Sequence, residues 1–259
     1  MTVGTDRERV DFLPSRGKEV SLSYDEHGSI LVHDHDDMRY LCLGSPCEQS
    51  CLSKMNPSLL QHEYTRAMML VLLFSQPKSV TILGLGGGAL VHCLYQHLPS
   101  VKITAIEFRR AVIDTAYRFF QLPRDAGRIN VIEIEAGNYL ARAAANSIDI
   151  IFSDLFNAYD ADSQQTDSAF YMRCHRLLTD DGWLVVNYDE HNIDKLREIC
   201  GCFASLYLCA PSTGNLIMLA SKKNTTADSV FLKERAIELS KILGFSVSKN
   251  VERLVQLTG

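Results

Sequence analysis

Near its N-terminal end the chain alternates apolar and polar residues with the two-residue period of β-strands. The pattern predicts antiparallel strands over Ser21–Tyr24, Ser29–His33 and Met38–Leu43, joined by short polar turns. The segment Gly44-Ser45-Pro46 then breaks the alternation. We therefore expect a small antiparallel β region at the start of the chain.

Further along, apolar strand-like runs alternate with segments of helical period, which is the pattern of a mostly parallel sheet covered by helices on both faces. The polar pair Gln49-Ser50 is expected to begin a connection, and a helix is expected from Pro57 to Gln76. The expected parallel strands are Ser79–Leu83, Lys102–Glu107, Arg128–Glu135, Ser147–Ser153 and Trp183–Tyr188. The helices expected among them are Arg109–Phe120, Tyr139–Ala145, Ser168–Leu178 and Asn192–Cys200.

The last part of the chain predicts an antiparallel hairpin followed by two helices. Strands over Phe203–Cys209 and Asn215–Ala220 flank a turn that contains Pro and Gly. Amphipathic helices are expected over Phe231–Leu243 and Asn250–Leu257. The resulting division is an N-terminal β region, a Rossmann-like domain and a C-terminal helical extension, at residues 1–48, 49–222 and 223–259.

The composition limits the classes of function. With 259 residues, of which 46% are hydrophobic, the chain can form one large domain or a domain with a small appendage. The net charge of −5 and the lack of a long basic run argue against nucleic-acid binding. No apolar run reaches the ~18 residues that span a bilayer, and the charged N-terminus lacks an apolar signal region. We expect a cytoplasmic protein without a nucleic-acid or membrane partner.

The cysteines and histidines do not predict a metal site. Eight cysteines are scattered over expected strands and helices, and reduced thiols are their expected state in a chain without a secretion signal. Their spacings do not match a zinc site. The run from His33 to Asp37 offers ligand side chains, but we interpret it as the polar tip of a hairpin. No bound metal is expected.

The main candidate for chemistry is a strand, glycine loop, helix and second strand over residues 79–107. The glycines of the loop are Gly84, Gly86, Gly87 and Gly88. Glycines let the main chain turn sharply and approach a ligand, and the helix after them offers unpaired N–H groups. Glu107 ends the second strand 23 residues after Gly84, close to the ~20-residue spacing at which an acid meets ribose hydroxyls. This order predicts a nucleotide-binding βαβ unit.

The loop allows three interpretations. A dinucleotide fingerprint G-x-G-x-x-G starting at Gly84 would place its third glycine at Ala89, a tolerated change. A methyltransferase-type loop, which cradles an adenosyl sulfonium instead of a pyrophosphate, fits at least as well. The interpretation without a ligand is a tight strand–helix turn with Glu107 as a solvated strand end.

Further polar residues follow neighbouring strands at the edge where open parallel sheets bind their ligands. Gly137 and Asn138 follow the third strand, and Asp154 follows the fourth. Asn138 can contact an adenine, cap the next helix, or do both. Asp154 can face a ligand or cap the loop from Leu155 to Asp167, which has the length of a functional lid. We expect these residues to share one crevice with the glycine loop and Glu107.

The ordered set of motifs resembles the polyamine aminopropyltransferases, the spermidine synthase-like family, over residues 20–222. The matching features are the N-terminal β region, Gln49-Ser50, the helix with Tyr64, Gly84–Gly88, Glu107, Gly137-Asn138, Ser153–Asn157 and Ala210–Gly214. The resemblance implies a class I S-adenosylmethionine-methyltransferase-like, Rossmann-like fold and a homodimer. It also implies transfer of an aminopropyl group from decarboxylated S-adenosylmethionine to a diamine in polyamine biosynthesis.

The same resemblance assigns roles to individual residues. It places Asp154 and Tyr64 in the catalytic machinery, where a carboxylate takes a proton from the attacking amine. The residues that would hold the S-adenosyl nucleoside are Gln49, Gly84, Gly86, Gly87, Gly88, Glu107, Gly137, Asn138 and Asp154. Further carboxylates would hold the cationic amines.

Three positions depart from the family's pattern. Its glycine-loop acid falls on Gly87, its adenine-side acid on Asn138, and its second strand-end acid, the base, on Asn157. An amide can hydrogen-bond an adenine, but it cannot accept a proton near neutral pH. The sequence therefore predicts retained nucleoside binding with aminopropyl transfer that is weakened, altered or absent, unless Asp154 or an acid of the following loop substitutes.

Two alternatives stay open. Without an acid at Gly87 the loop no longer repels a methionine carboxylate, which favours an S-adenosylmethionine-dependent methyltransferase. The other alternative is a non-catalytic binding or assembly module, in which the N-terminal β region and the C-terminal helices form a dimer.

Overall fold

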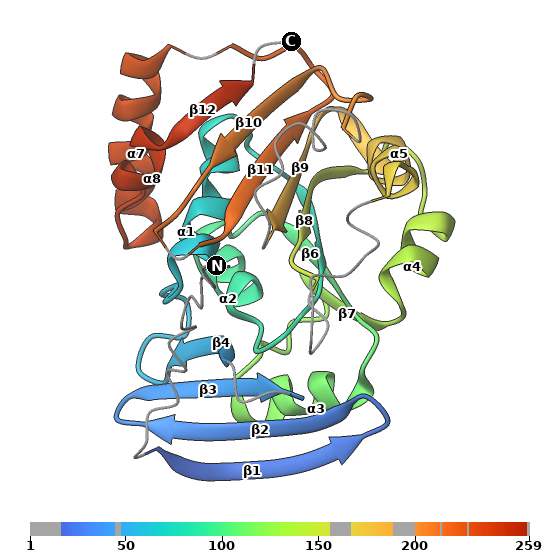
Figure 1. Ribbon diagram of the computed structural model, residues 1–259, viewed down its shortest axis with the longest axis vertical. Coiled ribbons are helices and arrows are strands. Elements are labelled where there is room, and N and C mark those ends of the chain that lie inside the picture. The colour runs from blue at the N-terminus through green and yellow to red at the C-terminus, as the bar shows by residue number, and fades with distance from the viewer. Residues whose placement is uncertain are drawn as a thin grey trace, which may run out of the picture.

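The computed structural model contains a small sheet of N-terminal strands and a large sheet covered by helices (Figure 1). It describes residues 17–44, 48–155, 167–188, 200–212, 214–226 and 228–257. Within these ranges, no helix has the length and apolar character needed to cross a membrane. The cysteines in the same ranges are free thiols.

The small sheet has four antiparallel strands in the order β1-β2-β3-β4. Their bounds are β1 (Lys18–Asp25), β2 (Gly28–His35), β3 (Met38–Leu43) and β4 (Glu48–Ser53). The expected strands are confirmed, but the expected connection at Gln49-Ser50 is wrong because both residues lie in β4. The first half of β4 is polar, and its buried apolar residues are only Cys51 and Leu52. Pairing with β3 makes this segment a strand.

The large sheet has eight strands in the order β12-β10-β11-β9-β8-β5-β6-β7. Their bounds are β5 (Ser79–Leu83), β6 (Lys102–Glu107), β7 (Ile129–Glu133), β8 (Ile148–Ser153), β9 (Leu178–Tyr188), β10 (Ser205–Cys209), β11 (Leu216–Ser221) and β12 (Leu254–Leu257). Strands β7, β6, β5, β8 and β9 are parallel to one another, and β11, β10 and β12 extend the sheet with antiparallel pairs. The mostly parallel sheet with an antiparallel hairpin is thus confirmed.

Helices cover both faces of the large sheet, as the alternation of elements predicts. They are α1 (Glu63–Met68), a 3-10 turn (Met69–Leu73), α2 (Ala89–His97), α3 (Arg110–Phe119), α4 (Ala136–Arg142), α5 (Ser168–Leu177), α7 (Ser229–Leu243) and α8 (Ser248–Glu252). Neighbouring side chains of β8 belong to two different hydrophobic clusters. Ile150 and Phe152 belong to the cluster that includes residues of α2 and α7, and Ile151 belongs to the cluster that includes residues of α4 and α5. Figure 1 shows α7 and α8 on one side and α4 and α5 on the other.

Two expected helices differ from the structure. The helix expected from Pro57 begins only at Glu63, because residues 57–62 form turns. The helix expected over Asn250–Leu257 ends at Glu252, and the last four residues form β12, which pairs with β10. Four residues are too few to show a two-residue period. The helix expected over Asn192–Cys200 lies almost entirely outside the described residues.

Two arginine side chains, Arg39 and Arg109, connect the small sheet to the end of the large one. Arg39 of β3 donates two hydrogen bonds to Asp34, at 2.7 and 2.8 Å, and one to the carbonyl of Phe119 at the end of α3. The Arg39 guanidinium lowers the pKa of Asp34 to about 2. At the start of α3, Arg109 binds Asp25 through two nitrogens, at 3.0 and 2.7 Å. These contacts place β4 and the turn between β1 and β2 beside the carboxyl ends of the parallel strands.

Candidate functional site

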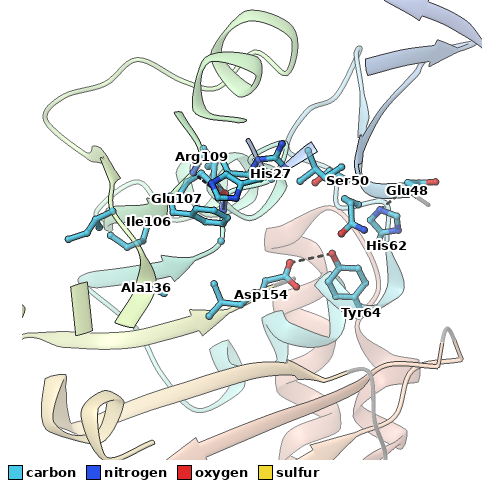
Figure 2. Close-up of a pocket in the computed structure, with 18 of the residues that line it drawn as sticks. His27, Glu48, Ser50, His62, Tyr64, Ile106, Glu107, Arg109, Ala136 and Asp154 are labelled. Carbon is cyan, nitrogen blue, oxygen red and sulfur yellow. Dashed lines mark hydrogen bonds and ion pairs between the residues drawn. The ribbon is translucent and has the colours of Figure 1, made fainter. Parts of the chain in front are cut away.

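A cavity of about 510 Å³ lies between the small sheet and the carboxyl ends of β5, β6 and β8 (Figure 2). It is lined by His27, Leu43, Glu48, Gln49, Ser50, His62, Tyr64, Gly84, Leu85, Gly86, Ile106, Glu107, Phe108, Arg109, Ile134, Ala136, Asp154, Leu155 and Asn215. The structure therefore brings Gln49, Tyr64, Glu107 and Asp154 together with Gly84 and Gly86, whereas the predicted loop glycines Gly87 and Gly88 do not line the cavity. In the described part of the chain, no group of three His, Cys, Asp or Glu side chains is arranged to hold a metal ion.

The glycine loop is shaped by its contact with the end of β8. Gly84 has a φ of +90°, and a Cβ at this position would lie 2.3 Å from the carbonyl oxygen of Asp154. No other residue type fits such a gap without moving the backbone. At the other end of the loop, Gly88 adopts a φ of +81° and precedes the first turn of α2. At the glycine loop, the backbone that follows β5 therefore passes in close contact with the backbone that follows β8.

Gly87 is packed so closely that no side chain fits at this position. A Cβ on Gly87 would lie 2.9 Å from the ring of Phe120 and 3.1 Å from the Cβ of Ser50. The N–H of Gly87 donates to the Ser50 hydroxyl at 3.0 Å. Strand β4 therefore holds the glycine loop through Ser50.

Glu107 is a buried carboxylate at the end of β6, with 8% of its surface exposed. Its Oε1 accepts from the N–H of Arg109 at 3.0 Å, and its Oε2 accepts from the N–H of Leu85 at 3.3 Å. Burial raises its pKa, and these backbone donors act in the opposite direction. The guanidinium of Arg109 binds Asp25 instead of Glu107. Glu107 therefore keeps acceptor capacity toward the cavity, because a carboxylate offers about four lone-pair directions.

Asp154 follows β8 and lies in the floor of the cavity (Figure 2). Tyr64 donates its hydroxyl to Oδ2 at 3.3 Å, and Asn187 donates its amide to Oδ1 at 2.9 Å. Asn215 in turn donates to the side-chain oxygen of Asn187 at 3.0 Å. Burial raises the pKa of Asp154, and burial together with the Asp154 charge raises the pKa of Tyr64. This network fixes the positions of Asp154 and Tyr64.

The sequence analysis missed three groups of this site. Asn187 is fully buried within the apolar run that ends β9, from Trp183 to Tyr188, and a polar residue in such a run was the signal that could have revealed it. Glu48 and His62 also line the cavity, with the Nε2 atom of His62 3.1 Å from the Oε1 atom of Glu48. No sequence spacing connects these two, since β4 and the residue before α1 meet only in the folded chain.

Gly137 and Asn138 lie in α4, not in the turn that was expected before it. The cap of α4 is Glu135, whose carboxylate accepts from the N–H groups of Gly137 and Asn138, at 2.9 Å each. The alternative of Asn138 as the helix cap is therefore wrong. From this helix it is Ala136 that lines the cavity, and the side chain of Asn138 is exposed. Asn157 and the acids at 160 and 162 lie outside the described residues.

The arrangement of strands and the position of the cavity define a class I S-adenosylmethionine-methyltransferase-like fold. The Spermine/spermidine synthase domain family matches residues 61–230. The chain belongs to this family.

Known proteins resemble the chain over most of its length. A polyamine aminopropyltransferase of Neisseria meningitidis serogroup A is 29% identical over 221 residues, which cover 82% of this chain and 84% of the relative. A spermidine synthase solved with the transition state analogue AdoDATO has a TM-score of 0.68 at 19% identity, covering 91% of this chain and 82% of that one. Human methyltransferase-like protein 13, solved with SAH, has a TM-score of 0.63 at 21% identity, covering 71% of this chain and 93% of that one.

Proposed function

We propose that the cavity binds an S-adenosyl nucleoside and that the chain carries out an altered form of aminopropyl transfer. The observation that carries the proposal is Glu107, a buried carboxylate that faces the cavity beside the glycine loop. Such an acid is suited to hold two ribose hydroxyls, since each donates to one carboxylate oxygen. The apolar residues Ile106, Ile134 and Ala136 lie on the same side and offer a surface for a purine.

Similar proteins support the choice of ligand. The spermidine synthase and human methyltransferase-like protein 13 described above were solved with AdoDATO and SAH, both S-adenosyl nucleosides. Open parallel sheets bind their ligands beyond the carboxyl ends of the strands, and the cavity of this chain lies at those ends.

The charges that line the cavity favour a donor without a carboxylate. The acids are Glu48, Glu107 and Asp154, while the guanidinium of Arg109 is held by Asp25. Intact S-adenosylmethionine would bring its own carboxylate toward these acids and gain no guanidinium for it. Decarboxylated S-adenosylmethionine carries only positive charge in its tail. We therefore favour aminopropyl transfer over methyl transfer.

The transfer step needs an uncharged amine. The amine nitrogen attacks the carbon beside the sulfonium, the C–S bond breaks with its electron pair going to sulfur, and the nitrogen loses a proton to a base. The family's base position is Asn157 in this chain, and an amide does not take that proton. Asp154 is already engaged by Tyr64 and Asn187. We expect slow transfer to the diamine as a consequence.

Calorimetric titration tests the choice of ligand. We expect the protein to bind 5′-methylthioadenosine, and to bind decarboxylated S-adenosylmethionine more tightly than the intact compound. Tighter binding of intact S-adenosylmethionine would support the methyltransferase alternative. Failure to bind any of the three at millimolar concentration would support a non-catalytic module.

A turnover assay tests the altered chemistry. With decarboxylated S-adenosylmethionine and putrescine, we expect spermidine to form well below the ~1 to 1000 per second that is typical of enzymes. A turnover number inside that range would show that the amide at Asn157 does not leave the site without a base.

A further inference from the structure

Helix α7 carries a concentration of exposed apolar side chains. Ten large apolar side chains are exposed in the part of the chain that the structure describes, and four of them lie on this helix. These four are Val230, Phe231, Ile237 and Ile242. Figure 1 shows α7 at the outer edge of the molecule. Exposed apolar side chains that gather on one element indicate a surface for contact with another molecule.

Two of these side chains belong to a row with apolar ends and a charged centre, which we call the α7 stripe. The stripe consists of Phe231, Arg235, Glu238 and Ile242. Steps of four, three and four residues place them along one side of the helix. Phe231 and Ile242 are 49% and 54% exposed. Arg235 lies over the Phe231 ring, 5.6 Å from its centroid, and neither Arg235 nor Glu238 forms an ion pair with another residue in the described ranges.

The order of the stripe is complementary to itself when a second copy of α7 runs antiparallel to the first. In that arrangement Arg235 lies opposite Glu238 of the second copy, and Glu238 lies opposite Arg235 of the second copy. Phe231 then lies opposite Ile242 at both ends. A two-fold axis through the middle of the stripe relates the two sets of contacts, as in an isologous dimer. A parallel helix would place each charge against its like, which is unfavourable.

A groove beside the stripe offers room for the Phe231 ring of the second copy. The groove has a volume of about 360 Å³ and lies between α7 and the segment that joins α2 to β6. Leu98, Pro99 and Ile242 contribute apolar walls, and Arg235 also lines the groove. Because Ile242 lies opposite Phe231 in the antiparallel arrangement, the aromatic ring meets the groove at its apolar part.

We propose that two copies of this chain associate through α7, antiparallel across a two-fold axis. Ion pairs between Arg235 and Glu238 form the centre of the interface, and Phe231 of each copy enters the groove of the other. The partner is a second copy because the order of charges along the stripe complements itself. The proposal does not depend on the proposed function, since no residue of α7 lines the cavity that contains Glu107.

Sedimentation velocity of the full chain tests the pairing through its charges. We expect the natural chain to be dimeric at micromolar concentration. Arg235→Glu and Glu238→Arg each place like charges opposite one another, and each is expected to raise the dissociation constant of the dimer at least about 100-fold. The double variant Arg235→Glu/Glu238→Arg exchanges the charges and is expected to be dimeric again. Lys233→Glu is the matched control, since Lys233 is exposed on α7 outside the stripe and does not line the groove.

An equimolar mixture of the two single variants tests the antiparallel register. One variant carries two acids at the centre of the stripe and the other carries two arginines, so each repels itself and attracts the other. We expect the mixture to form a heterodimer. Phe231→Ser tests the apolar end and is expected to weaken association about tenfold or more. Thermal unfolding checks that each variant is folded.

Several results would overturn the proposal. A natural chain that stays monomeric at micromolar concentration excludes the dimer. Single variants that associate as the natural chain does, or a control variant that dissociates as they do, show that the contact lies elsewhere. A mixture of folded single variants that forms no heterodimer contradicts the antiparallel pairing.

Discussion

A Glu107→Gln variant is expected to bind 5′-methylthioadenosine about 10- to 100-fold more weakly than the natural chain, which corresponds to one or two lost charge-assisted hydrogen bonds. The glutamine has nearly the same size, but its amide offers one acceptor oxygen where the carboxylate offers two. That oxygen is required by the N–H groups of Leu85 and Arg109, which the carboxylate holds at present. The ribose hydroxyls would then face an NH2 group, which cannot accept hydrogen bonds from them.

The matched control for this variant is Glu133→Gln. Glu133 stands directly beside Glu107 in the register of β6 and β7, but its side chain is about half exposed, and it does not line the cavity. We expect the control to keep its nucleoside affinity in the same calorimetric titration. Thermal unfolding of the free proteins checks that Glu107→Gln is folded. Equal affinity in a folded Glu107→Gln would show that Glu107 does not contact the nucleoside.

Gly84→Ala is expected to destabilise the protein by about 3 kcal/mol or more, because two costs combine. The φ of +90° disfavours any residue with a Cβ by about 1–2 kcal/mol. In addition, the new Cβ would lie 2.3 Å from the carbonyl oxygen of Asp154, a backbone atom that cannot turn away. The strand ends of β5 and β8 would have to separate.

Gly214→Ala separates these two costs. Gly214 has a φ of +88°, almost the value at Gly84, and a Cβ there would meet nothing within 4 Å. We expect this control to lose only about 1–2 kcal/mol, the cost of the backbone conformation. Urea unfolding of the three proteins gives the free energies of unfolding. Equal losses in the two variants would mean that the crossing of the glycine loop and β8 is not tightly packed.

The central part of the fold was accessible from the sequence because its signals are local. Each parallel strand, such as Lys102–Glu107, is a short apolar run, and buried strands of this kind read as continuous hydrophobic segments. The glycines between β5 and α2 and the acid at the end of β6 follow from the same βαβ unit. Since the carboxyl ends of neighbouring parallel strands meet at one edge, Glu107 and Asp154 could be expected in one crevice.

The elements that were missed depend on contacts between distant parts of the chain. Strand β4 is polar where it begins, and β12 has four residues, so each is defined by the strand that it pairs with. The Glu135 carboxylate caps the first turn of α4. The sequence analysis placed Gly137 in a turn because it did not include this cap. His62 and Glu48 meet only because the contacts of Arg39 with Phe119 and of Arg109 with Asp25 hold the small sheet in place.

The folded chain differs from the sequence pattern on the amine side of the cavity. The sequence indicates a loss of acids, because it compares this chain with the family position by position. The fold adds Glu48, an acid at a position where the family comparison gave no reason to look. The number of acidic side chains available to a ligand therefore follows from the residues that line the folded cavity, and not from the family's sequence positions alone.

A crystal structure of the protein soaked with 5′-methylthioadenosine shows directly whether the cavity holds a nucleoside. We expect the ribose to lie against Glu107, the purine beside Ile106 and Ala136, and the thioether sulfur on the Asp154 side of the cavity. A nucleoside bound in another groove, or a cavity that stays empty at millimolar ligand, would contradict it.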